Sequence, residues 1–185
     1  MTKETILKII DEISTAASQT DDLTCQKLID SILTSNQVFS AGAGRSGELM
    51  KCFAKRLMHA ELSSYVVGET VSPPAKKGDL LIIGSGSGET ESLVIIAKKA
   101  KKLGVKLALI TTNPKSTLAG LADIILEIKA STPKSTQSKE SLSFQPMANL
   151  FEQMLYLTTD AISMMVAKEK GLDYTKMFAR HANLE

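Results

Sequence analysis

Apolar residues in the first part of the chain recur every three or four positions. One such stripe consists of Ile6, Ile9, Ile10, Ile13 and Ala17. A second stripe follows Asp21 and Asp22 and contains Leu28, Ile29, Ile32 and Leu33. This spacing places apolar side chains on one face of an α-helix, and an aspartate in front of the stripe is a common N-cap. We therefore expect two helices within residues 1–35.

Beyond residue 35, short apolar runs alternate with longer amphipathic segments. The expected strands are residues 38–41, 65–67, 80–83, 105–111 and 124–128, and the expected helices between them are 47–60, 89–103 and a short one around Leu118. Short apolar strands that alternate with helices indicate a parallel sheet covered on both faces. The predicted fold class is α/β, a doubly wound parallel sheet of the flavodoxin or Rossmann type in one domain over residues 1–185.

The last third of the chain changes character twice. Residues 130–143 are rich in Ser, Thr, Pro, Lys and Gln, so we expect an exposed loop or lid. The final long helix, predicted over 147–170 with Gly171 as its C-terminal cap, is apolar on nearly all sides. Its apolar positions are Leu150, Phe151, Met154, Leu155, Leu157, Ala161, Ile162, Met165 and Val166. A helix this apolar is expected to pack against the sheet and a partner subunit together, which predicts a homo-oligomer.

Composition excludes several classes of protein. Lys and Arg total 22 against 20 Asp and Glu, and aromatic residues make up 4% of the chain, so nucleic acid is not an expected partner. No apolar run is long enough to span a membrane, and the first ten residues lack the apolar core of a signal peptide, so we expect a cytoplasmic protein. Cys25 and Cys52 are expected as reduced core thiols, and no set of residues has metal-ligand spacing.

Residues 78–90, GDLLIIGSGSGET, read as a strand, a loop of small and hydroxyl residues, and the start of a helix. The glycines let the backbone approach a ligand, while Ser85, Ser87 and Thr90 add hydroxyl donors beside the free amides of the helix N-terminus. Such a loop binds phosphate through amide donors and the positive end of the helix dipole. The whole loop, Ser85, Gly86, Ser87, Gly88, Glu89 and Thr90, is therefore a candidate phosphate site.

A second loop of this kind lies in residues 38–47, VFSAGAGRSG. Its glycines also fit the GxGxxG pattern of dinucleotide sites, with Glu69 as the acidic residue that would hold a ribose. Arg45, by contrast, suits a bidentate contact to an anion or a developing oxyanion, and Ser46 lies beside it. We favour a small phosphorylated ligand over a dinucleotide and keep the latter as an alternative.

Together with these two loops, the segments KRLMHAE at 55–61, QPMANLFEQ at 145–153 and RHANLE at 180–185 give the chain a recognisable pattern. The sequence resembles the 6-phospho-3-hexuloisomerase family, within the sugar isomerase (SIS) domain superfamily, over essentially its whole length. The resemblance implies interconversion of D-arabino-hex-3-ulose 6-phosphate and fructose 6-phosphate, without metal or nucleotide cofactor. It also implies a place in the ribulose monophosphate pathway of formaldehyde fixation, and a tetramer built from two dimers.

The resemblance also suggests roles for single residues. Glu152 matches the family's proposed proton acceptor, and its apolar neighbours predict a partly buried carboxylate suited to general-base catalysis. The two histidines of the chain, His59 and His181, are candidates for proton transfer to hydroxyl groups or for ring opening. Glu69 is a candidate for orienting a substrate hydroxyl or a structural residue at the strand end. Two other functions stay open, a non-catalytic phosphosugar-binding module and a dinucleotide-dependent oxidoreductase.

Overall fold

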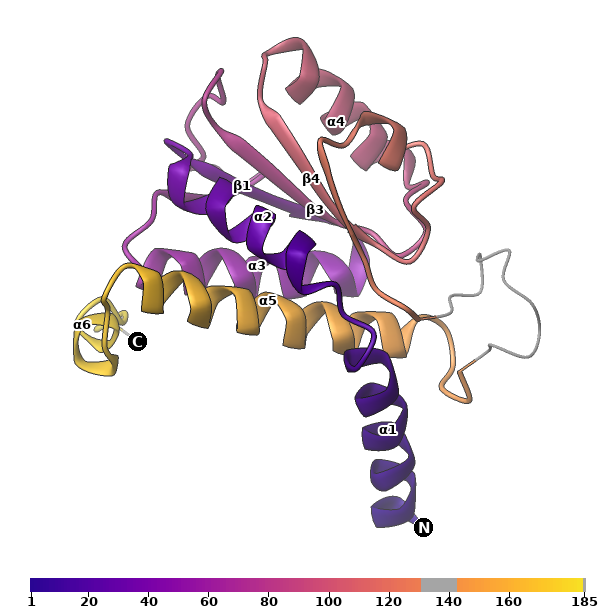
Figure 1. Ribbon diagram of the computed structural model, residues 1–185. Helices are drawn as coiled ribbons and strands as arrows, with labels where there is room; N and C mark the ends of the chain where they lie inside the picture. Colours follow the sequence, from indigo (N-terminus) through magenta and orange to yellow (C-terminus); the bar gives the residue numbers. More distant parts are fainter. Residues whose placement is uncertain (131–142, 185) are drawn as a thin grey trace.

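A five-stranded parallel sheet forms the centre of the computed structural model, which describes residues 1–130 and 143–184 (Figure 1). Its strands are β1 (Val38–Gly42), β2 (Ser64–Val66), β3 (Leu80–Gly84), β4 (Lys106–Thr111) and β5 (Ile124–Glu127), in the order β2-β1-β3-β4-β5. The strand order reverses between β1 and β3, which pair with Gly42 opposite Gly84. In an open parallel sheet, ligands bind beyond the carboxyl ends of the strands at such a switch point.

Helices cover both faces of the sheet, which confirms the predicted fold class. One face packs against α2 (Asp22–Thr34), α3 (Gly44–His59) and α5 (Asn149–Glu169). The opposite face packs against α4 (Glu91–Lys102) and the 3-10 turn η1 (Ala119–Leu121). Because successive strand side chains point to opposite faces, Leu80 and Ile82 join the first core, whereas Leu81 and Ile83 join the second.

Helix α1 (Thr2–Ala17) and helix α6 (Tyr174–Phe178) complete the described structure. Helices α3 and α5 lie side by side and start at the same edge of the sheet, whereas α1 extends away from the other elements (Figure 1). None of the helices in the described residues is long and apolar enough to cross a membrane. The predicted loop at 130–143 falls almost entirely outside the described residues.

Three helix boundaries differ from those predicted. Helix α3 begins at Gly44, so Arg45 and Ser46 belong to its first turn. Helix α4 begins at Glu91, with Thr90 as its N-cap. Helix α5 begins at Asn149 because Met147 has a φ of 58°, a left-handed conformation that cannot continue a helix. Its predicted end is confirmed, since Gly171 has a φ of 64° and the Leu172 N–H donates to the Ala167 carbonyl.

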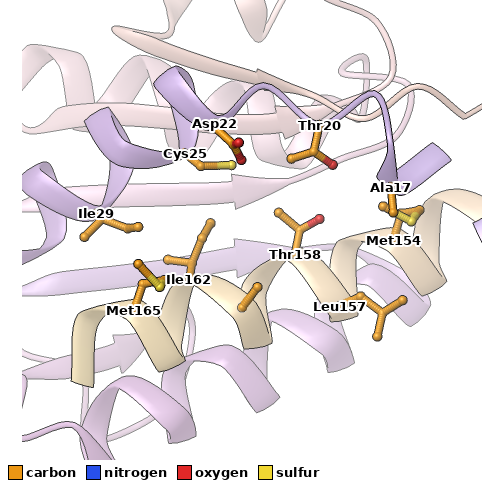
Figure 2. Close-up of a pocket in the computed structure, with 11 residues that line it drawn as sticks. Ala17, Thr20, Asp22, Cys25, Ile29, Met154, Leu157, Thr158, Ile162 and Met165 are labelled. Carbon is orange, nitrogen blue, oxygen red and sulfur yellow. The ribbon is translucent and has the colours of Figure 1, made fainter. Parts of the chain in front are cut away.

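The outward face of α5 remains apolar. Met164 is 71% exposed and Leu157 is 45% exposed, although both lie on the helix whose inner side fills the core. Beside them, an apolar groove of about 310 Å³ separates α5 from the start of α2 (Figure 2). Cys25 lies half-buried in this groove, whereas Cys52 is exposed on α3. The expectation that Cys52 is a core thiol is wrong, because its position on α3 points away from the sheet.

Candidate functional site

A cleft of about 500 Å³ lies at the carboxyl edge of β1 and β3. The residues that line it are Ala43, Gly44, Arg45, Ser46, Gly86, Ser87, Met147, Ala148, Phe151 and Glu152. They come from three segments that are far apart in sequence, namely the first turn of α3, the loop after β3, and the start of α5. The N-terminal ends of two long helices therefore meet at one cavity, where their free N–H groups favour an anion.

The turn between β1 and α3 requires glycine for reasons of space. A Cβ on Gly42 would lie 2.9 Å from the Cα of Gly47, so the chain can close this turn only without side chains there. The close approach places Arg45 and Ser46 at the mouth of the cleft. These glycines thus have a structural explanation that needs no dinucleotide.

The loop after β3 presents its hydroxyl groups as donors. The Gly88 N–H donates to Ser85 Oγ at 3.2 Å, and the Glu89 N–H donates to Ser87 Oγ at 3.3 Å. A serine hydroxyl that accepts a backbone hydrogen bond still has its own proton to donate, and Ser87 can offer that proton to a ligand in the cleft. Ser87 and Gly86 line the cleft, whereas Ser85 is buried beneath the loop.

Glu89 contacts the neighbouring loop rather than the cleft. Its Oε1 accepts a hydrogen bond of 2.8 Å from the Thr117 N–H, and hydrogen bonds from Thr117 lower the pKa of this carboxyl. Neither Glu89 nor Gly88 nor Thr90 is among the residues that line the cleft. Their candidacy as substrate-binding residues therefore stays a prediction.

Glu152 lies in the first turn of α5, facing Arg45 across the cleft. Arg45 Nε is 2.9 Å from Glu152 Oε2, while Arg45 Nη1 donates to Asn149 Oδ1 at 3.1 Å. The Glu152 side chain is 14% exposed and that of Arg45 is 72% exposed, so the carboxylate is held inside the cleft and the guanidinium at its rim. Among the described residues no hydrogen-bond donor is aligned with Glu152 Oε2. The structure confirms the expected partial burial of this carboxylate.

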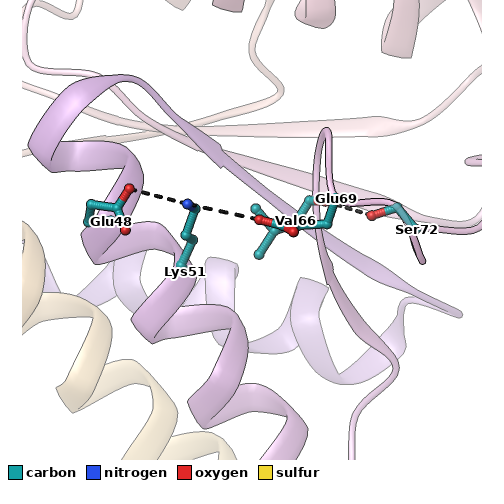
Figure 3. Close-up of polar contacts among 5 residues, drawn as sticks. All are labelled: Glu48, Lys51, Val66, Glu69 and Ser72. Carbon is teal, nitrogen blue, oxygen red and sulfur yellow. Dashed lines mark hydrogen bonds and ion pairs between the residues drawn. The ribbon is translucent and has the colours of Figure 1, made fainter.

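Glu69 lies outside this cleft. It follows β2, two strands away from β3, and its carboxylate is 3.9 Å from Lys51 Nζ on α3 (Figure 3). Lys51 also bonds Glu48 at 3.2 Å, so Glu69 belongs to a surface chain of alternating charges. Its proposed role toward a substrate hydroxyl stays a prediction, and the structure does not bring it to Glu152.

The two histidines come together at the opposite end of α3. The rings of His59 and His181 stack with their centroids 5.8 Å apart, and Arg180 Nε donates to the Met58 carbonyl at 3.1 Å. At about 1.5 Å of rise per residue, the length of α3 puts this pair about 21 Å from Arg45 in the same chain. His59 is buried, and its Nε2 has no hydrogen-bond partner among the described residues. Burial and the nearby Lys55 and Arg56 lower the pKa of His59.

Several cleft residues lie in the segment 145–153 that carries the family resemblance, but the sequence analysis gave none of them a role of its own. Met147, Ala148 and Phe151 line the cavity although their types suggest only core packing. Asn149 holds Arg45 across a separation of 104 residues in the chain. Only the positive φ of Met147, which turns the chain sharply into α5, explains why this segment faces the loops at all. In the described part of the chain, no three His, Cys, Asp or Glu side chains are grouped so that they could hold a metal ion.

Comparison with known proteins gives consistent matches over the whole chain. A family model described as SIS domain matches residues 31–155. A 3-hexulose-6-phosphate isomerase of Bacillus subtilis (strain 168) is 45% identical over 100% of this chain and 99% of that protein. The enzyme of the same name from Mycobacterium gastri is 40% identical over 95% of this chain and 87% of its own. A crystal structure from Methanococcus jannaschii, for which the molecular function of 3-hexulose-6-phosphate isomerase was inferred, matches with a TM-score of 0.85 and 33% identity. That match covers 98% of this chain and 99% of the other.

Proposed function

Since the chain belongs to the SIS domain family, among the 3-hexulose-6-phosphate isomerases, we propose that it interconverts D-arabino-hex-3-ulose 6-phosphate and fructose 6-phosphate. The single observation that carries this proposal is a partly buried carboxylate, Glu152, which lines the same cleft as a loop of amide and hydroxyl donors. The reaction moves a carbonyl between C3 and C2 of the sugar. It needs one base, one anchored phosphate and a donor for the oxygen that becomes negative.

The phosphate is held at the loop after β3. The Ser87 hydroxyl and the backbone amides of Gly86 and Ser87 are uncharged donors beside the positive end of the α4 dipole. This anchor lies on the opposite side of the cleft from Glu152, so the reacting carbons of the sugar extend toward the carboxylate. Two further hydroxyl residues complete the anchor. Ser85 supports the loop from below, and Thr90 is the N-cap of α4.

Glu152 then moves one proton between adjacent carbons. It removes the proton on C2 of the 3-ulose, the C2–H bonding pair becomes the double bond of an enediolate, and the C3 oxygen takes the negative charge. The proton of the C2 hydroxyl passes to the C3 oxygen, and Glu152 returns its own proton to C3, so that the carbonyl lies on C2 and the product is fructose 6-phosphate. A single carboxylate that reaches both carbons is sufficient.

Arg45 stabilises the enediolate. Its side chain is mostly exposed, so it can leave Glu152 at little cost and turn toward the developing oxyanion, with Ser46 beside it. The departure of the guanidinium also frees the basic lone pair of Glu152. Asn149 keeps one end of Arg45 in place in the meantime.

His59 and His181 serve the cleft of a neighbouring copy of the chain in this proposal. Within one chain they are a full helix length from Glu152, whereas the apolar outward face of α5 offers a surface for assembly. We extend the proposal to a homotetramer of two dimers, located in the cytoplasm and acting in the ribulose monophosphate pathway after formaldehyde has been fixed.

Hydrogen exchange in deuterated water tests the reaction directly. Incubation with fructose 6-phosphate should replace the hydrogen on C3 with deuterium, because C3 is deprotonated when the enediolate forms. Unphosphorylated fructose should exchange far more slowly, since it lacks the anchor. Exchange at C1 instead would indicate an aldose–ketose isomerase of a different regiochemistry, and no exchange at any carbon would support a non-catalytic phosphosugar-binding module.

The dinucleotide alternative has lost its support. The glycines of the first loop are explained by close packing, and Glu69 is engaged with Lys51. The relatives from Bacillus subtilis and Mycobacterium gastri, matched over 95% or more of this chain, are named as isomerases.

A further inference from the structure

The loop after β4 lies directly against the candidate phosphate loop. Strands β3 and β4 pair in parallel with Gly84 opposite Ile110, so both chains leave the sheet side by side. A Cβ on Gly88 would overlap the Ser116 hydroxyl, and Gly88 itself has a φ of 66°. The two loops therefore form one packed unit rather than two independent turns.

Three successive carbonyl groups of the phosphate loop accept hydrogen bonds from this neighbour. The Gly86 carbonyl accepts from the Thr112 N–H at 3.1 Å, from Thr112 Oγ1 at 2.8 Å and from Thr111 Oγ1 at 3.1 Å. The Ser87 carbonyl accepts from Asn113 Nδ2 at 3.3 Å, and the Gly88 carbonyl accepts from the Leu118 N–H at 3.1 Å.

The burial of the threonines makes this arrangement specific. Thr111 is 0% exposed and Thr112 is 3% exposed, in a core where valine would have the same shape. A buried hydroxyl is costly unless it finds a partner, and here both hydroxyls donate to the same carbonyl oxygen. The polar residues thus serve the loop, because the packing by itself does not require them.

The effect on a bound anion follows from the planarity of the peptide. The carbonyl of Gly86 and the N–H of Ser87 belong to one peptide group and point in opposite directions. Donors that hold the carbonyl toward β4 therefore aim the Ser87 N–H into the cleft, and they polarise that peptide so that its N–H is a better donor. They also keep a negative oxygen away from a site that must bind phosphate.

We propose that Thr112, together with Thr111, is a positioning residue that fixes the Gly86–Ser87 peptide so that its N–H binds the phosphate of the substrate. The proposal rests on the proposed function, since it takes the loop after β3 to be the phosphate anchor. It adds two residues at the end of β4, which touch no ligand themselves, to the residues that determine the affinity for phosphate.

Thr112→Val tests the proposal because it removes one hydroxyl without changing the shape of the side chain. The Gly86 carbonyl keeps two donors, so the fold should survive. Calorimetric titration with inorganic phosphate should show Kd raised about 2- to 10-fold, the range expected for one lost hydrogen bond. KM for fructose 6-phosphate should rise by the same factor with kcat within about 2-fold, because the phosphate contact persists in the transition state. The double variant Thr111→Val/Thr112→Val should show a larger rise, and Thr112→Ser should restore the wild-type values.

Thr159→Val is the matched control. Thr159 is also buried and its hydroxyl also donates to a backbone carbonyl, but it lies on α5 away from the loop. The Thr159→Val variant should lower the melting temperature about as much as Thr112→Val does, and its affinity for phosphate should be unchanged. An unchanged phosphate Kd in Thr112→Val, or a fall in kcat with unchanged KM, would overturn the positioning role.

The two proposals fail in distinguishable ways. If the wild type exchanges hydrogen on C3 of fructose 6-phosphate while Thr112→Val binds phosphate normally, the positioning role is wrong and the isomerase is not. If Thr112→Val weakens phosphate binding but the wild type exchanges no sugar hydrogen, the isomerase proposal is wrong and the positioning role stands. A wild type that binds no phosphate overturns the positioning role and the phosphate anchor together.

Discussion

At the scale of single residues, the cleft combines a carboxylate and a guanidinium that are 107 positions apart in the chain (Glu152 and Arg45) yet lie 2.9 Å from each other. The pair is asymmetric, because the carboxylate is enclosed and the guanidinium is exposed. An exposed partner of an ion pair contributes little to stability and is easily displaced. The pair is therefore better suited to catalysis than to holding α3 and α5 together.

We predict that Glu152→Gln lowers kcat by about 10² to 10⁴, the usual contribution of a general base. The amide keeps the size and one hydrogen-bond acceptor but has no basic lone pair. KM should change little, since the phosphate is held on the opposite side of the cleft. Steady-state kinetics with fructose 6-phosphate, and C3 exchange in deuterated water, measure both quantities.

Glu48→Gln is the control for that variant, because it replaces the same type of side chain by the same amide. Glu48 lies on the exposed side of α3, where it bonds Lys51. The Glu48→Gln variant should leave kcat within about 2-fold of the wild type, the small effect expected of an exposed ion pair. A Glu152→Gln protein that turned over at a near wild-type rate would rule out Glu152 as the base.

At the scale of elements, the segment that follows α6 contacts the end of α3 at His59. The ring is buried against His181, and within residues 1–130 and 143–184 its Nε2 has no hydrogen-bond partner that would stabilise a proton there. Lys55, Arg56 and Arg180 add positive charge on the same side, and together with burial they lower its pKa below the ordinary value of 6.5.

This arrangement predicts a loss of stability in mild acid. As the pH falls through about 6.5, the unfolded chain takes up a proton on His59 before the folded chain does, so the free energy of unfolding decreases. The decrease ends once the folded pKa has been passed. Glu12 and Asp123, whose pKa values are also lowered, lose their stabilising effect only as the pH falls below 4.5 and 3.8.

Urea unfolding at a series of pH values checks this expectation. The wild type should lose stability as the pH falls below about 6.5, whereas His59→Gln should lose less there and should still lose stability in stronger acid. Equal slopes for both proteins just below pH 6.5 would contradict a lowered pKa of His59.

At the scale of the whole molecule, apolar surface gathers on two elements. Helix α1 extends from the body with Ile6 51% and Ile10 52% exposed, and α5 exposes Leu157 and Met164 beside the groove of Figure 2. Contiguous apolar surface of this kind is a typical docking surface for a second copy. In the proposed assembly, His59 and His181 of one chain could lie at the cleft of a neighbouring chain.

Leu157→Glu should therefore break the assembly. Sedimentation of the wild type should give a multiple of the 19.9 kDa chain mass, and the variant should sediment as the single chain. If a neighbouring chain completes the cleft, the Leu157→Glu variant should also lose activity. Leu103→Glu is the matched control, since Leu103 is 53% exposed at the end of α4, on the other side of the sheet. A wild type that sediments at the single-chain mass at micromolar concentration would contradict the assembly.

Mixing two inactive variants shows which subunit supplies the histidine. Glu152→Gln and His181→Gln, refolded or exchanged together, should recover activity, because some clefts would combine an intact Glu152 with an intact His181 from a neighbour. Recovery would be absent if both residues acted from one chain, and a fully active His181→Gln protein would remove this histidine from the mechanism.

The sequence alone determined the layers of the fold and the loop that we propose as the phosphate site. Short continuous apolar runs and stripes of period 3.6 are local, so the five strands and the helices between them could be located to within a few residues. The predicted boundaries were wrong where the backbone conformation overrides the side-chain pattern. Met147 was predicted to start the last helix, but its left-handed φ excludes it from α5. The small and hydroxyl residues after β3 were recognisable because their chemistry is contained in six consecutive positions.

Only the tertiary structure decided which residues share a site. Arg45 meets Glu152 because α3 and α5 start at the same edge of the sheet, and Thr112 meets Gly86 because β3 and β4 are neighbours in space. The same geometry separates His59 from Glu152, since α3 carries its two ends to opposite edges of the sheet. Contacts between distant positions leave no periodic trace in the sequence, because they depend on strand order and helix direction, which only the packed chain fixes.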